Sequence, residues 1–160
     1  MTLTLAARVG ARLLRQGVTL AVAESCTGGL LGAQVTAVSG SSAYFLGGVI
    51  SYSNAAKTRF LGVSARLLST HGAVSLETAA AMAKGARRAF GADYGVGITG
   101  IAGPGGAVAG KPVGTVCMAV AGPNGVTAGR YQFPGHRGAV RRAACRKAFE
   151  MLDECLGPVA

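Results

Sequence analysis

Ser25 is the residue of this chain whose surroundings best suit nucleophilic chemistry. It follows a short apolar run, residues 18–23, and precedes a glycine-rich turn and an apolar segment, residues 30–35, of helical character. A serine between a strand and a helix lies where backbone N–H groups converge, and such groups stabilise an oxyanion or hold a phosphate. The spacing is not the G-x-S-x-G of serine hydrolases. Spacing alone favours the simpler interpretation, in which Ser25 caps the helix.

Neither histidine of the sequence is well placed to activate Ser25. His71 precedes Gly72 at a predicted helix end, where a cation suits the helix dipole and a structural role is indicated. His136 stands among arginines and is expected to be exposed. A lysine is therefore the remaining candidate for the base.

Lys57 is the lysine whose position best suits that role. It follows the apolar stretch 44–52, and if Ser53 or Asn54 caps a helix, Lys57 falls in the first turn. Burial and the positive end of the helix dipole would both lower the pKa of its ammonium group. Tyr52 could relay the proton or orient both groups. Composition alone instead favours a solvated helix lysine.

Two further segments suit an anionic ligand. The glycine-rich segment 99–106 follows a predicted strand and allows a ligand to approach the backbone closely, although its spacing matches neither a Walker A motif nor G-x-G-x-x-G. A wide structural turn explains it equally well. Arg137 and Arg141 are four residues apart and would share a helix face, where guanidinium groups suit phosphate. A solvated basic face is the usual alternative.

The four cysteines give little support to metal or disulfide chemistry. No C-x-x-C occurs, and neither histidine lies near a cysteine pair, so a zinc site is not indicated. Cys26 stands next to Ser25 and is an alternative nucleophile, but a buried inert thiol is the usual state of such a residue. No signal-peptide pattern and no run of about 18 apolar residues are present, which predicts a cytoplasmic protein with free thiols that does not span a membrane.

The segments around these residues alternate between strand and helix patterns. Such alternation predicts one α/β domain with a mixed sheet and helices on both faces. The pair Asn124-Gly125 between two strand-like runs predicts a hairpin. Strands are expected at 18–23, 44–52, 94–100, 113–121 and 126–133, and helices at 5–16, 30–35, about 54–61, 64–71, 76–90 and from about 136 to 156.

Composition narrows the class of protein further. A chain of 160 residues that is 50% hydrophobic can bury a sizeable core, and its 14% of charged residues excludes a disordered chain. The net charge of +10 favours anionic partners such as nucleotides, polynucleotides or anionic membranes. The six acidic residues do not cluster near turns, so neither a carboxylate cage for Mg²⁺ or Ca²⁺ nor a glycosidase carboxylate pair is supported.

Four stretches in this order and spacing together resemble the CinA C-terminal domain family, in its PncC type of nicotinamide-nucleotide amidase. The resemblance runs from about residue 5 to residue 156. It implies a three-layer α/β/α fold and a single domain, residues 1–160, in a stand-alone form without the additional N-terminal domain of the larger CinA proteins. The stretches that carry it are residues 23–29, 52–57, 61–63 with 71–75, and 99–106 with 111–116.

The resemblance also implies an activity and a site. The activity is hydrolysis of nicotinamide mononucleotide to nicotinate mononucleotide and ammonia, with Ser25 as nucleophile, Lys57 as base, Tyr52 linking them, and neither metal nor cofactor. One departure is His136, because the family often has an acid before the first arginine of the last helix. The residues expected to bind substrate are Thr27, Gly28, Gly29, Asn54, Thr99, Gly100, Arg137 and Arg141.

Two other functions remain open from the sequence. The net charge and the family's association with DNA-uptake competence allow a nucleic-acid-associated or scaffold protein, but aromatic residues are only 6% and no recognition motif is visible. The same fold could also hydrolyse another small amide. The apolar composition and the resemblance predict a homo-oligomer.

Overall fold

A computed structural model describes residues 3–158, and its centre is a five-stranded sheet. The strand order is β2-β1-β3-β4-β5, with β1 parallel to both β2 and β3, and with β4 antiparallel to β3 and β5. The mixed sheet is therefore confirmed. The strands are β1 (Leu20–Glu24), β2 (Phe45–Ile50), β3 (Tyr94–Gly100), β4 (Thr115–Gly122) and β5 (Gly125–Gln132).

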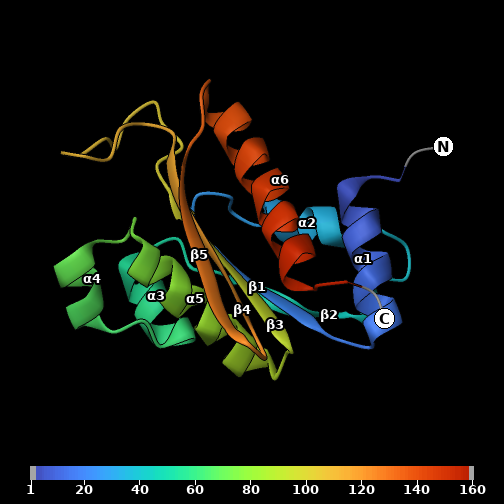
Figure 1. Cartoon of the computed structure of the whole chain (residues 1–160). Helices are drawn as coiled ribbons and strands as arrows, with labels where there is room; N and C mark the ends of the chain where they lie inside the picture. Colours follow the sequence, from blue (N-terminus) through green and yellow to red (C-terminus); the bar gives the residue numbers. More distant parts are fainter. Residues whose placement is uncertain (1–2, 159–160) are drawn as a thin grey trace.

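Helices cover both faces of this sheet, which confirms the three-layer α/β/α architecture (Figure 1). One layer contains α1 (Leu5–Gln16), α2 (Leu30–Thr36) and α6 (Arg137–Cys155). The other contains α3 (Asn54–Leu61), α4 (Ala65–His71) and α5 (Leu76–Phe90). A short 3₁₀ helix, Ser41–Ala43, lies between α2 and β2.

The core forms on both sides of the sheet because its central strands are almost wholly buried. All five residues of β1 are buried, and so are the first seven of β4. Val22 and Met118 pack in the cluster toward α6, whereas Leu61 and Met82 belong to a cluster on the opposite face. Each such fully buried side chain contributes about 1.5–3 kcal/mol of transfer free energy.

Helix α5 packs close to β3 because that strand presents glycine to it. A Cβ atom at Gly97 would lie 2.5 Å from the carbonyl oxygen of Ala79, and one at Gly95 would collide with the carbonyl of Ala83. Any larger side chain at these positions would push α5 away from the sheet. This close packing fixes β3 up to its last residues, Thr99 and Gly100, which lie at the site described below.

Element boundaries differ from the sequence predictions by one or two residues. β1 begins at Leu20 rather than residue 18, because the Thr19 N–H and hydroxyl both donate to the Asp93 carboxylate at 2.9 Å instead of extending the strand. The predicted hairpin is confirmed, with its turn between Gly122 and Gly125. Within residues 3–158, no helix has both the length and the apolar character needed to cross a membrane.

Candidate active site

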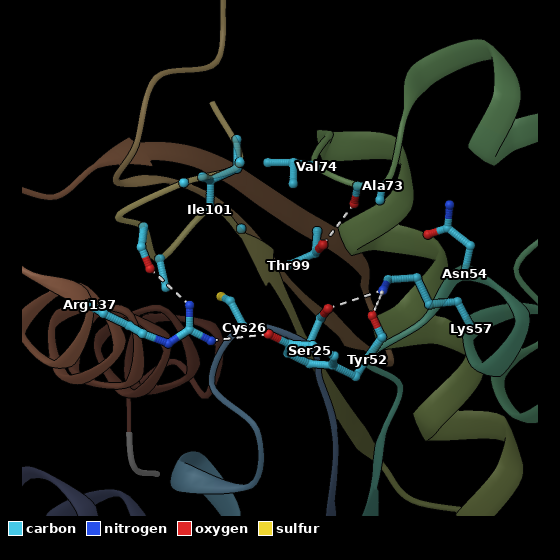
Figure 2. Close-up of a pocket in the computed structure, with 15 residues that line it drawn as sticks. Ser25, Cys26, Tyr52, Asn54, Lys57, Ala73, Val74, Thr99, Ile101 and Arg137 are labelled. Atoms are coloured by element: carbon cyan, nitrogen blue, oxygen red, sulfur yellow. Dashed lines mark hydrogen bonds between the residues drawn. The ribbon is translucent and has the colours of Figure 1, made fainter. Parts of the chain in front are cut away.

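The candidate site lies where the three parallel strands end. β1 lies between β2 and β3, so the segments that follow all three strands meet at one edge of the sheet, where α/β folds commonly bind ligands. A cavity of about 290 Å³ opens there (Figure 2). That volume is near the lower end of the range for small-molecule pockets, about 300–1,000 Å³. The lining residues are Ser25, Cys26, Tyr52, Asn54, Lys57, Ala73, Val74, Thr99, Gly100, Ile101, Ala102, Gly103, Gly105, Gly106 and Arg137.

Ser25 and Lys57 are in direct contact inside this cavity. The Lys57 Nζ atom donates to the Ser25 Oγ atom at 3.0 Å, as Figure 2 shows. The same Nζ donates to the carbonyl oxygens of Ser51, at 2.8 Å, and Tyr52, at 3.4 Å. An ammonium group would donate to all three oxygens, whereas a neutral amine would donate to the two carbonyl oxygens and accept from the Ser25 hydroxyl through its lone pair.

Lys57 is buried because its helix begins where the sequence predicts. The Ser53 hydroxyl accepts from the N–H of Ala56 and caps α3, which places Lys57 in the first turn with its side chain directed inward. Only 1% of Lys57 is exposed, and burial lowers its pKa below the ordinary value of 10.5. No acidic side chain forms an ion pair with it among residues 3–158. Burial therefore shifts the equilibrium of Lys57 toward the neutral amine, which is the form that can accept a proton.

The turn after β1 is anchored by Glu24, a buried carboxylate that the sequence analysis did not single out. Its side chain is 2% exposed and accepts from the N–H groups of Gly29, Leu31 and Gly32 at 2.8–3.1 Å. A carboxylate at a helix N-terminus satisfies N–H groups that have no partner inside the helix. Glu24 thus fixes the start of α2 relative to the end of β1.

Two N–H groups of this turn have no acceptor among residues 3–158. The Ser25 N–H donates to the carbonyl of Ile98 and the Gly28 N–H to the carbonyl of Ser25. The N–H groups of Cys26 and Thr27 donate to no other group in the described part of the chain. Because Cys26 lines the cavity and Thr27 does not, the Cys26 N–H is the candidate donor for an oxyanion formed next to Ser25.

The predicted substrate-binding residues of the turn lie outside the cavity lining. Gly28 and Gly29 have φ values of 56° and 100°, a backbone region that favours glycine, and they shape the turn. Thr27 is fully buried. Arg141 donates to the carbonyl oxygens of Cys26, at 3.1 Å, and Thr27, at 2.8 Å, so its guanidinium group contacts the turn itself.

Arg137 and Tyr52 form the rim of the cavity. The Arg137 guanidinium donates to the Tyr52 hydroxyl at 3.1 Å and to the carbonyl of Gly103 at 2.9 Å. The Tyr52 side chain extends toward Arg137 rather than between Ser25 and Lys57 (Figure 2), and 62% of Tyr52 is exposed. The structure therefore does not show the linking position expected for its hydroxyl, because Lys57 reaches Ser25 directly.

The remaining predicted substrate-binding residues all line the cavity. The Thr99 hydroxyl donates to the carbonyl of Ala73 at 2.7 Å, which ties the end of β3 to the segment before α5. At Gly100, a Cβ atom would lie 2.8 Å from a Val116 methyl group, so only glycine fits there. Asn54 is the first residue of α3 and is exposed.

The alternative catalytic residues are poorly placed for catalysis. Burial raises the pKa of the Cys26 thiol to about 11, so the reactive thiolate is scarce at neutral pH. His136 is exposed, and its Nδ1 caps α6 by accepting from the N–H groups of Gly138 and Ala139. His71 ends α4 and lies 3.5 Å from a Glu77 carboxylate oxygen. Within residues 3–158, no three His, Cys, Asp or Glu side chains are grouped as metal ligands would be.

Fold and site together define an α/β/α domain with a buried serine–lysine pair at the carboxyl edge of its parallel strands. The family model of the CinA C-terminal domain matches residues 2–156, and the chain belongs to that family.

Solved structures of the family share the whole fold. A competence/damage inducible protein, CihA, from Agrobacterium tumefaciens is 41% identical, with a TM-score of 0.92 over 99% of this chain and 100% of that one. A CinA superfamily protein from Klebsiella pneumoniae is 38% identical, with a TM-score of 0.92 over 95% of each chain.

A curated relative is longer than this chain. A CinA-like protein from Citrifermentans bemidjiense is 54% identical over 147 residues, which are 91% of this chain and 36% of that protein. The chain thus spans about a third of the length of the curated relatives it matches.

Proposed function

We propose that this domain is an amidohydrolase in which Ser25 is the nucleophile and Lys57 the general base. The observation that carries the proposal is the 3.0 Å contact between the Ser25 hydroxyl and the buried Lys57 amine. A serine hydroxyl is a weak nucleophile until an adjacent base accepts its proton. A neutral lysine amine held by two carbonyl oxygens meets that requirement.

In the acylation step, the Ser25 Oγ atom attacks the carboxamide carbon while its proton passes to Lys57. The tetrahedral intermediate carries its negative charge on the former carbonyl oxygen, which the N–H group of Cys26 would stabilise. Lys57 then returns the proton to the nitrogen, the C–N bond breaks, and ammonia leaves. An ester between substrate and Ser25 remains.

In the deacylation step, water attacks this ester. Lys57 accepts a proton from the water and returns it to the Ser25 oxygen as the ester bond breaks. The products are a carboxylic acid and the free enzyme. The cycle needs no group beyond the described residues, the substrate and water.

We propose nicotinamide mononucleotide as the substrate, which is what the sequence resemblance implies. The volume of the cavity suits a group of the size of a pyridine carboxamide beside Ser25. Arg137 at the rim offers a guanidinium group to a phosphate, and Gly105 and Gly106 in the cavity lining would let a ligand approach their backbone closely. The net charge of +10 would attract such an anion.

The substrate is tested with a panel of amides. Ammonia release by the wild-type protein is compared for nicotinamide mononucleotide, nicotinamide riboside, free nicotinamide and asparagine. The mononucleotide should give the highest kcat/KM. Preference for another amide would reassign the substrate, and no release from any of them would contradict the amidase assignment.

A nucleic-acid-associated role is the second candidate, because the net charge is +10 and related structures carry competence names. A gel-shift titration with duplex and single-stranded DNA at two salt concentrations tests it. Saturable binding that weakens with salt would support this role. No binding at low salt would contradict it.

A further inference from the structure

The turn that carries the nucleophile Ser25 is held by Arg141, which donates hydrogen bonds to two carbonyl oxygens of this turn. Arg141 lies one helical turn after Arg137 on α6, yet its guanidinium group does not line the cavity. Its Nε atom donates to the Cys26 carbonyl at 3.1 Å and its terminal nitrogen to the Thr27 carbonyl at 2.8 Å. Both hydrogen bonds are made within the protein, and the position of Arg141 outside the cavity lining is poorly suited to binding a substrate phosphate there.

These two bonds determine where the neighbouring N–H groups point. In a planar trans peptide the N–H points opposite to the C=O. Because the Cys26 carbonyl faces Arg141, the Thr27 N–H points away from that guanidinium group, and it has no acceptor among residues 3–158. The Thr27 carbonyl likewise faces Arg141, and the Gly28 N–H of the same peptide turns back to the Ser25 carbonyl at 3.1 Å.

Glu24 secures the other end of the same turn. Its carboxylate accepts hydrogen bonds from the N–H groups of Gly29, Leu31 and Gly32, whereas Arg141 donates to carbonyl oxygens. Arg141 thus binds two carbonyl oxygens of the turn and Glu24 binds its later N–H groups. The N–H groups of Cys26 and Thr27 have no acceptor among residues 3–158. Arrangement of fixed donors before reaction is what makes an oxyanion site effective.

We infer that Arg141 is a positioning residue. It holds the Thr27–Gly28 peptide, whose N–H donates to the Ser25 carbonyl, and thereby fixes the Ser25–Cys26 peptide so that the Cys26 N–H serves as the oxyanion donor for Ser25. This inference rests on the proposed nucleophile. It replaces the expected contact between Arg141 and the substrate phosphate with a contact that acts through the turn. Arg137, at the cavity rim, remains the arginine available to the phosphate.

Covalent labelling of Ser25 tests this inference without requiring turnover of any substrate. Pyridine-3-sulfonyl fluoride is uncharged and has no phosphate group. The Ser25 Oγ–S bond forms while the S–F bond breaks, fluoride leaves, and the hydroxyl proton passes to Lys57. The labelling rate is measured by intact mass, and peptide mapping assigns the label to Ser25.

Three variants are compared with the wild type. Arg141→Ala should label about 10²-fold more slowly, the lower end of the loss seen when an oxyanion donor is removed. Arg141→Lys keeps the charge but lacks a guanidinium group that can donate to two carbonyls at once. Its labelling rate should lie between those of Arg141→Ala and the wild type. Arg142→Ala is the matched control, because the next residue of α6 is exposed, and it should label at the wild-type rate.

Kinetics with nicotinamide mononucleotide and nicotinamide riboside provide a readout that a phosphate contact would move differently. A positioning role predicts that Arg141→Lys lowers kcat by the same factor for both substrates, with little change in KM. Loss confined to KM for the mononucleotide would assign Arg141 to the phosphate and overturn the inference.

The labelling results also separate the two levels of the proposal. Wild-type rates in both Arg141 variants, each shown to be folded by thermal denaturation, would overturn the positioning role and leave Ser25 as nucleophile. If Arg141→Ala does not fold, Arg141→Lys alone decides. Absence of any label on wild-type Ser25 would contradict the nucleophile itself, and the inference with it.

Discussion

The Oγ atom of Ser25 and the Nζ atom of Lys57 lie 3.0 Å apart although the residues are 32 positions apart in the sequence. They meet because β1 and β2 are adjacent and parallel, so both chain segments leave the sheet at the same edge. A direct contact allows proton transfer without an intermediate group. It also makes the protonation state of Lys57 the property on which the proposed chemistry depends.

Replacement of Lys57 by methionine should remove the base without harming the fold. We expect kcat/KM to fall about 10²–10⁴-fold, the usual contribution of a general base. The free energy of unfolding should not decrease, because an apolar side chain of similar length replaces a buried amine. Ammonia release and urea denaturation measure the two effects.

Lys84→Met is the control for that experiment, because Lys84 is exposed on α5. It should retain the wild-type rate. A Lys57→Met protein that turns over within tenfold of the wild type would show that another group accepts the proton.

The rate should rise with pH. Burial lowers the pKa of Lys57 from 10.5, and only the neutral amine accepts a proton, so kcat/KM should increase through the folded-state pKa and level off above it. The inflection should lie below pH 10.5. A pH–rate profile that is flat across the whole range of stability would contradict the role of Lys57.

The same shift has a consequence for stability. Because the pKa is lower in the folded state, the unfolded chain binds more protons between the two pKa values, and the contribution of Lys57 to stability grows with pH in that window. Lys57→Met should remove this component. Urea denaturation of both proteins at several pH values measures the difference.

Tyr52 and Arg137 should act as a coupled pair in substrate binding. Their side chains share a 3.1 Å hydrogen bond at the cavity rim, so Tyr52→Phe releases one anchor of Arg137. Each of Tyr52→Phe and Arg137→Ala should raise KM for nicotinamide mononucleotide. The double variant should fall short of the product of the single effects, with a coupling of at least about 0.5 kcal/mol.

Tyr52→Phe combined with Arg142→Ala is the matched cycle, and its effects should multiply. A fall in kcat at unchanged KM in Tyr52→Phe would instead support the proton-linking role that the sequence resemblance implies.

Glu24 should contribute to stability through three N–H groups. Glu24→Gln keeps the shape but removes the charge and brings an amide donor toward other donors, so the free energy of unfolding should fall by about 1.5–3 kcal/mol. Urea denaturation measures this loss. Glu154→Gln, at an exposed position, should change stability little, and an equal loss in both variants would contradict the anchoring role.

Much of the fold was predictable because local signals agree with the tertiary structure. Helices α1 and α5 end at residues 16 and 90 as predicted, each followed by a glycine with positive φ, Gly17 or Gly91, and the Asn124-Gly125 pair forms the hairpin turn. The cap at Ser53 is a local signal as well, and it was enough to place Lys57 in the first turn of its helix.

Contacts with backbone groups of distant segments were not predictable from the sequence. The position of Arg141 against the Cys26 and Thr27 carbonyls depends on how α6 crosses the sheet, which no pattern within α6 encodes. Glu24 could have been noticed, since an acid before a glycine turn and a helix suits the N–H groups at the helix start. The Tyr52 hydroxyl faces Arg137, 85 residues away, and neighbouring residues do not indicate this.

Ammonia release from nicotinamide mononucleotide, measured in EDTA for wild type and Ser25→Ala side by side, tests the central claim most directly. The account predicts steady release by the wild type and none by Ser25→Ala, which should still bind the mononucleotide in a calorimetric titration. Release by Ser25→Ala at a rate near that of the wild type would contradict it.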